Sequence, residues 1–150
     1  MNISSKGKYP ANKLSNFASH EFIVDNVKCS SMEGFLQSLK FSNIESQKIT
    51  CLLSGAAAKK KGSGRNSYWK SKQTLWWNGV TYKRNSKEYQ ELIDRAYDQL
   101  FLNVKFQEAL SSCDKKTVFT HSMGSNNKKE TVLTESEFCK RLFKLKQKTL

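Results

Sequence analysis

The sequence has no long hydrophobic run. Its first residues, Met1 to Lys8, lack the apolar core of a signal peptide, and no stretch approaches the roughly 20 apolar residues that cross a membrane. We therefore expect a cytoplasmic protein that does not act at a membrane.

Residues that bind metals or form disulfides are few and scattered. The four cysteines form no C-x-x-C pair, and there are only two histidines. Structural zinc needs a close set of such ligands, and widely spaced cysteines in a reducing compartment are typically free buried thiols. We expect no metal and no cofactor.

The standard catalytic motifs are also absent. There is no Walker A loop, no G-x-G-x-x-G, no H-E-x-x-H and no G-x-S-x-G. With two histidines and no nucleophile pattern, a Ser-His-Asp or Cys-His arrangement has little support. Chemistry based on carboxylates and lysines remains.

Negative charge is scarce. Thirteen acidic residues stand against 26 basic ones, which leaves a formal net charge of +13. No Asp or Glu occurs from Ser46 to Lys87, a stretch that holds Lys48, Lys59, Lys60, Lys61, Arg65, Lys70, Lys72, Lys83, Arg84 and Lys87. Such a field attracts polyanions, which are nucleic acid, phosphorylated metabolites or an acidic membrane surface. The alternative is an ordinary solvated surface on a basic protein.

The length and composition fit one domain. A chain of 150 residues with 37% hydrophobic and 11% aromatic residues can bury a core. We expect a flexible lead-in at residues 1–8 and a single domain at residues 9–150. Its fold class would be α+β and mainly helical, with five or six helices and one or two small β-hairpins, the hairpins turning at Asp25-Asn26 and Asn78-Gly79.

Three capping-box patterns predict helix starts at Ser30, Ser42 and Thr134, because each is followed three residues later by Glu. Apolar residues at helical spacing predict another helix from Ser86 to Leu100 and a shorter one from Asn103. Between Ala56 and Asn66 we expect a mobile basic loop, because Gly62 and Gly64 interrupt the helical pattern.

The stretch from Ser30 to Phe41 presents two different faces. Its apolar residues, Met32, Phe35, Leu36 and Leu39, recur at i, i+3, i+4 and i+7, as on a helix that faces a core. Glu33, Gln37 and Lys40 lie in a row on another face. This row is either a solvated polar face or the wall of a site.

Several of these residues together resemble the signature of the NADAR (YbiA-like) family. The resemblance lies in Asn16-Phe17, in Glu33, Gln37 and Lys40-Phe41 on the predicted helix, in Arg65, Trp69 and Lys72, and in the ending from Thr131 to Cys139. It extends over nearly the whole chain. It implies a YbiA-like domain and a hydrolase that cleaves N-glycosidic bonds of phosphorylated ribosyl compounds.

The resemblance also implies roles for individual residues. Glu33 would stabilise the oxocarbenium-like transition state and activate water. Lys40 or Lys72 would protonate the leaving base, hold phosphate or form a Schiff base. Trp69 would stack on the base, although plain core packing explains it equally well. The catalytic candidates are therefore Glu33, Lys40 and Trp69.

The remaining candidates would bind the substrate. Asn16, with its neighbour Phe17, and Gln37 would orient the ribose, and Lys59, Arg65 and Lys72 would bind phosphate. Many members of that family carry a second acidic residue in the last third of the chain, where this sequence has His121-Ser122. His121 or Ser122 would serve that part of the pocket, or the protein would bind a ribosyl ligand without cleaving it.

The function expected from these observations is an N-glycosidase that removes ADP-ribose from guanine bases in nucleic acid. The net charge favours this substrate. One alternative keeps the enzyme class but acts on phosphorylated intermediates of riboflavin synthesis. Another is a non-enzymatic, basic nucleic-acid-binding module.

Overall fold

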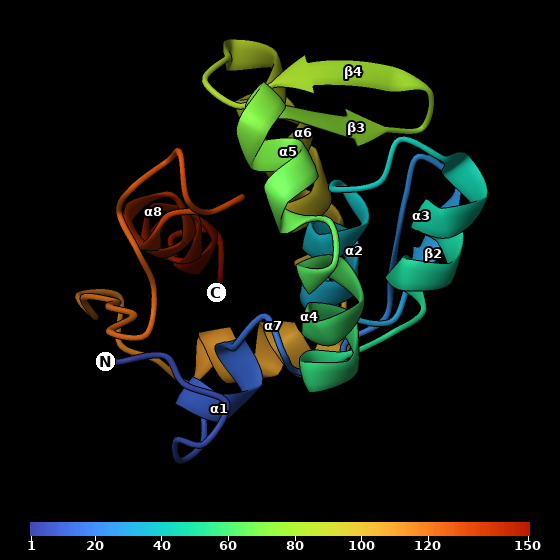
Figure 1. Cartoon of the computed structure of the whole chain (residues 1–150). Helices are drawn as coiled ribbons and strands as arrows, with labels where there is room; N and C mark the ends of the chain where they lie inside the picture. The colour runs from blue at the N-terminus through green and yellow to red at the C-terminus, as the bar shows by residue number, and fades with distance from the viewer.

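The computed structural model describes residues 1–150 and contains eight helices and two β-hairpins (Figure 1). In chain order the elements are α1 (Ala11–Leu14), β1 (Phe22–Val24), β2 (Val27–Cys29), α2 (Met32–Ser38), α3 (Ile44–Cys51), α4 (Gly55–Ser63), α5 (Asn66–Lys72), β3 (Thr74–Trp77), β4 (Val80–Lys83), α6 (Lys87–Leu100), α7 (Val104–Ser111) and α8 (Glu135–Lys146). The predicted α+β, mainly helical domain is confirmed, with more helices than the five or six expected.

One hydrophobic core of 30 buried residues holds these elements together. Helix α6 contributes its whole predicted stripe, and all of these side chains are at most 3% exposed: Tyr89, Leu92, Ile93, Ala96, Tyr97 and Leu100. Helix α2 contributes Met32, Phe35 and Leu36 from its apolar face. Burial of these two stripes is the main force that fixes the helices in place.

Both predicted hairpins are present. Asp25 and Asn26 adopt positive φ angles of 48° and 65°, and Asn78 and Gly79 adopt 50° and 88°, as tight two-residue turns require. The Trp77 indole N–H donates to Asp25 Oδ2 over 2.8 Å, which connects the two hairpins.

Two of the three predicted capping boxes are wrong by one residue. Ser31, not Ser30, caps α2, because its Oγ accepts from the Gly34 N–H and donates to Leu53 O. Asn43 caps α3 in place of Ser42. Helix α2 also ends at Ser38, so Lys40 lies in the turn that follows it.

The predicted mobile loop between Ala56 and Asn66 is also wrong, because α4 and α5 occupy most of it. Gly62 lies within α4 and serves close packing: a Cβ there would stand 1.8 Å from Gln37 Oε1. Gly34 on α2 has the same role, since its Cβ would stand 2.5 Å from Leu53 O. Gly34 thus lets α2 approach the backbone at the end of α3, and Gly62 lets α4 approach the Gln37 side chain of α2.

The first eight residues are docked on the domain, unlike the predicted flexible lead-in. Ile3 is fully buried, and its N–H donates to Thr120 O over 2.8 Å. The amino group of Met1 donates to Val118 O. No helix in the structure is both long enough and apolar enough to span a membrane.

Candidate functional site

A pocket of about 340 Å³ opens between α2, α4, α5 and the segment that precedes α8. The three predicted catalytic residues, Glu33, Lys40 and Trp69, all line it. So do five of the predicted substrate-binding residues: Asn16, Phe17, Gln37, Lys59 and His121. The polar row on α2 is therefore the wall of a pocket and not a solvated face.

The structure does not bring Arg65, Lys72 and Ser122 into this pocket. Asn66 and Trp69 of α5 line the pocket, whereas Arg65, which precedes the helix, and Lys72, its last residue, do not. Ser122 is exposed, and its N–H donates to Asn2 Oδ1.

Glu33 is a carboxylate held in a poorly hydrated position. Burial raises the pKa of Glu33, and this effect outweighs the hydrogen bond from Gln37 and the positive charge of Lys40. Gln37 Nε2 donates to Glu33 Oε1 over 2.8 Å, while the Glu33 N–H donates to Asn16 O. Such raised values gather at sites that bind or transfer protons.

Lys40 is the opposite charge at the other end of the row. Its side chain is 7% exposed, and Nζ donates to Asn66 Oδ1 over 2.6 Å. Burial lowers the pKa of Lys40 to about 8, although the Glu33 carboxylate partly opposes this. A lysine with this pKa can give or take a proton near neutral pH.

Two buried polar atoms in the pocket lack a partner within the protein. The Trp69 indole N–H has no acceptor and Gln37 Oε1 has no donor. Buried polar groups are normally paired, so two unpaired atoms beside one pocket are unusual, and Gln37 Oε1 packs against Gly62 of α4. Trp69 also belongs to the hydrophobic core, so core packing and ligand contact are compatible for this residue.

Neighbouring residues fix Asn16 and His121 at the pocket. The Tyr97 hydroxyl donates to Asn16 Oδ1 over 2.7 Å, which leaves the amide NH₂ free to donate. His121 Nδ1 lies 2.8 Å from Ile3 O. Because a carbonyl only accepts, Nδ1 carries the proton and Nε2 is the acceptor in the neutral ring. The docked N-terminal segment thus orients His121.

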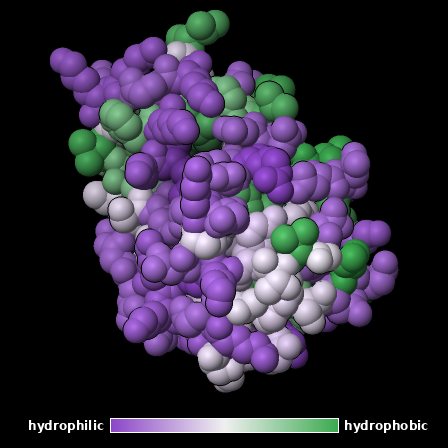
Figure 2. All heavy atoms as spheres, turned by 90° about the horizontal axis from the view of Figure 1, so that it is seen from above, coloured by the Kyte–Doolittle hydropathy of each residue, from purple (hydrophilic) through white to green (hydrophobic).

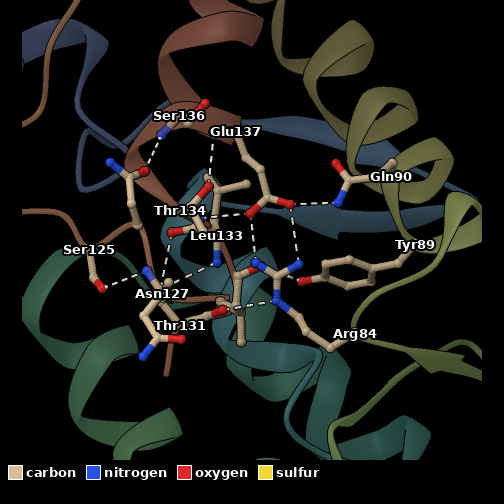
Figure 3. Close-up of polar contacts among 12 residues, drawn as sticks. Arg84, Tyr89, Gln90, Ser125, Asn127, Thr131, Leu133, Thr134, Ser136 and Glu137 are labelled. Carbon is tan, nitrogen blue, oxygen red and sulfur yellow. Dashed lines mark hydrogen bonds and ion pairs between the residues drawn. The ribbon is translucent and has the colours of Figure 1, made fainter. Parts of the chain in front are cut away.

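The segment Thr131–Thr134 forms one wall of the pocket and is held from behind (Figure 3). Arg84 Nε donates to Thr131 O over 2.9 Å, and the Tyr89 hydroxyl donates to Val132 O over 2.7 Å. Arg84 and Tyr89 are both buried. These two residues position the wall although neither lines the pocket.

Glu137 completes this support (Figure 3). Arg84 binds its carboxylate through two bonds of 2.6 and 3.2 Å, and the Thr134 N–H and Gln90 Nε2 also donate to it. Burial by itself would raise the pKa of Glu137, but the bonds from Arg84, Thr134 and Gln90 lower it to about 2. In the sequence, Arg84 is one basic residue among many, so only the Thr134–Glu137 capping box points to this network.

No group of three or more His, Cys, Asp or Glu side chains is gathered in a way that would hold a metal ion. The four cysteines are free.

The fold and the pocket define a small basic α+β protein in which a buried Glu–Gln–Lys row lines a polar pocket. The family model described as Bacteriophage protein GP30.3 matches residues 8–147. The chain is also 38% identical over 142 residues to an "Uncharacterized 17.1 kDa protein in Gp30-rIII intergenic region" of Enterobacteria phage T4, covering 92% of this chain and 91% of the relative. It therefore belongs to the bacteriophage GP30.3 family. No solved structure matches it.

These matches correct the family prediction. The resemblance to the NADAR family is wrong, because the GP30.3 match takes in nearly the whole chain and the resemblance depended on a few spaced residues. Glu33, Gln37 and Lys40 followed by a later Trp69 form a short pattern that does not define a family. The contacts of these side chains in the pocket do not depend on the family.

Proposed function

We propose that the pocket hydrolyses the N-glycosidic bond of a phosphorylated ribosyl substrate, with ADP-ribose attached to guanine in nucleic acid as the leading candidate. The observation that carries this proposal is the row of Glu33, Gln37 and Lys40 along one pocket wall. Burial shifts the pKa of Glu33 upward and that of Lys40 downward. Two groups with opposite shifts in one pocket suit an acid–base pair.

Glu33 acts on the sugar. When the bond from the anomeric carbon to the base breaks, the electron pair leaves with the base nitrogen and positive charge develops on the sugar. The Glu33 carboxylate stabilises that charge and accepts a proton from the attacking water. The buried position strengthens both effects because little solvent screens them.

Lys40 acts on the leaving base. With a pKa of about 8, its ammonium is mostly protonated at pH 7 yet acidic enough to give a proton to the departing nitrogen. The hydrogen bond to Asn66 Oδ1 fixes the position of Nζ. The proton on Glu33 then returns to Lys40 through solvent, which restores the ammonium and completes the cycle.

Three side chains would hold the ribosyl group. Asn16, Gln37 and Trp69 line the part of the pocket where a ribose would lie, and the Asn16 NH₂ donates to one of its hydroxyls. Lys59 is exposed and lines the pocket, which suits a phosphate. A volume of about 340 Å³ lies within the roughly 300–1,000 Å³ typical of small-molecule pockets.

The charge of the protein favours nucleic acid over a small free metabolite. The net charge is +13, and ten of the basic residues lie in the acid-free stretch that supplies Lys59 and Trp69. The free cysteines, three of them buried, fit a reducing compartment such as the cytoplasm.

The test offers the protein two substrates and follows product release by chromatography. One is a DNA oligonucleotide with ADP-ribose on guanine, and the other is a phosphorylated pyrimidine intermediate of riboflavin synthesis. We expect release of ADP-ribose from the first. Glu33→Gln should remove this activity, and the matched surface variant Glu108→Gln on α7 should keep it.

Other outcomes have clear meanings. Turnover of the riboflavin intermediate alone would move the proposal to that substrate. Full activity of Glu33→Gln would overturn the role of Glu33. No product from either substrate, together with DNA binding that is indifferent to Glu33→Gln, would favour the non-enzymatic nucleic-acid-binding module.

A further inference from the structure

The Arg65 guanidinium packs against aromatic rings and has no acidic partner. Its guanidinium carbon lies 4.2 Å from the centre of the Tyr68 ring and 5.7 Å from that of Phe41. It makes no ion pair and no side-chain hydrogen bond, and its Nε is a buried donor without an acceptor. An arginine held against aromatic rings keeps its planar fork ready for a phosphate at little entropic cost.

Two lysines extend this cluster on either side of Arg65. Lys61 Nζ lies 5.9 Å from the centre of the Phe41 ring, and Lys72 Nζ lies 5.4 Å from that of Tyr68. Neither makes an ion pair, whereas Lys70 on the same helix is paired with Glu130 over 3.0 Å. The Tyr68 ring in turn stacks on Trp76, with ring centres 5.2 Å apart.

The cluster continues into a second hollow. Lys72 is one of the residues that line a cavity of about 470 Å³, whose other basic lining residues are Lys83, Arg84, Lys128 and Lys129. No acidic residue lines this cavity. Seen from the side of the β3–β4 hairpin, the surface is mainly hydrophilic and has no broad apolar patch (Figure 2).

We infer that Lys61, Arg65, Lys72 and this cavity form a phosphate-binding track for a nucleic acid strand, outside the pocket. From Arg65 to Lys72 the helix rises roughly 10 Å, enough for more than one phosphate of a strand. Unpaired cations in a row suit a repeating polyanion, and the planar Arg65 fork suits phosphate. The track starts beside the pocket, because Arg65 precedes Asn66 and Phe41 follows Lys40.

The test measures binding of an unmodified, fluorescently labelled single-stranded DNA oligonucleotide by anisotropy at several salt concentrations. We expect Arg65→Gln to weaken binding about tenfold and to lower the slope of log K against log salt by about 1. Arg65→Lys keeps the charge but loses the fork, and should fall between wild type and Arg65→Gln. Lys72→Gln tests the same track at a second position.

The matched control is Lys105→Gln on α7, which lies at the opposite end of the molecule from α5 (Figure 1). It removes the same charge and should change binding less than twofold. Equal binding by Arg65→Gln and Lys105→Gln would overturn the track, and so would competition by polyglutamate as strong as that by unlabelled DNA.

Different results would overturn the phosphate-binding track and the proposed glycosidase function. DNA binding that depends on Arg65, without product from any ribosyl substrate, would reject the glycosidase and keep the track. Cleavage of an ADP-ribosylated guanosine, with DNA binding insensitive to Arg65→Gln, would reject the track and keep the glycosidase.

Discussion

Glu33 and Glu137 lie in the first turns of α2 and α8, and their surroundings differ in one decisive respect. Glu137 closes a capping box with Thr134 and binds Arg84 through both carboxylate oxygens. Glu33 stands one position closer to its cap, Ser31, and receives only a Gln37 amide. One helix start is therefore built around a fully paired carboxylate and the other around an underpaired one.

The pKa values of the two carboxyl groups shift in opposite directions as a result. Burial acts on both, but at Glu137 the bonds from Arg84 and Thr134 prevail and the pKa falls to about 2. At Glu33 burial prevails and the pKa rises. By linkage, ionised Glu137 stabilises the fold at pH values above its ordinary pKa, and this contribution is lost as pH falls from about 4.5 towards 2. Glu33 has the opposite sign, because its ionisation destabilises the fold as pH rises above 4.5.

Glu137→Gln should have the largest effect. It leaves the Arg84 guanidinium, which is 1% exposed, without its counter-ion. Breaking a buried pair in this way costs about 3–5 kcal/mol of unfolding free energy. Urea denaturation at pH 7 measures the loss, and the exposed Glu88→Gln on α6 is the control. The gap between the variant and wild type should narrow as pH falls from about 4.5 and close near pH 2, and a constant gap across pH would contradict the linkage.

Glu33→Gln should do the reverse. Because it removes a carboxylate whose burial is unfavourable, we expect the same or a higher melting temperature at pH 7, as at many functional sites. Glycosidase activity should fall about 100-fold or more. Calorimetry and product release measure the two effects. A loss of stability as large as that of Glu137→Gln would erase the contrast between the two glutamates.

Gly62→Ala should perturb one glutamate and spare the other. The new Cβ would stand 1.8 Å from Gln37 Oε1, so Gln37 must move, at a cost of about 1–3 kcal/mol of unfolding free energy. The displaced amide would leave Glu33 without its hydrogen bond. Gly64→Ala is the matched control, because nothing lies within 4 Å of its added Cβ. Equal denaturation midpoints for the two variants would exclude close packing at Gly62.

Local patterns made much of this fold predictable. The α6 stripe from Tyr89 to Leu100 and the turns at Asp25-Asn26 and Asn78-Gly79 depend on residues close in the sequence, and all are present. The Glu33–Gln37–Lys40 row could also be found, because helical spacing brings Glu33 and Gln37 to one face and the turn after α2 carries Lys40 on from them. Its placement in a pocket depends on α5 and the segment before α8, which no local pattern specifies.

The errors arise where distant contacts decide between local alternatives. Ser30 and Ser31 are both possible caps, and the bond from Ser31 Oγ to Leu53 O, 22 residues away, selects the second. In the sequence, Gly62 predicts an interrupted helix. Only the packing of α2 against α4 shows that the glycine is there to make room for Gln37. Arg84 and Glu137 are 53 residues apart, so their pairing has no signal in one sequence. Several of the residues behind the resemblance that misled the family prediction line this pocket, but they say little about ancestry.

The smallest expected effect concerns Lys40, which lies at the other end of the row from Glu33. In wild type the glycosidase activity should fall as pH rises through about 8, where Lys40 loses its proton, and should also fall at low pH as Glu33 is protonated.

Lys40→Arg keeps the charge and remains protonated, so the high-pH loss should disappear while the rate at pH 7 drops about tenfold through poorer proton donation. The low-pH loss, which belongs to Glu33, should remain in both proteins. Lys105→Arg on α7, which is exposed and lies outside both the pocket and the track, should leave the whole profile unchanged. A profile of kcat/KM against pH in which Lys40→Arg keeps the high-pH loss would assign that step to another group and separate Lys40 from the proton transfer.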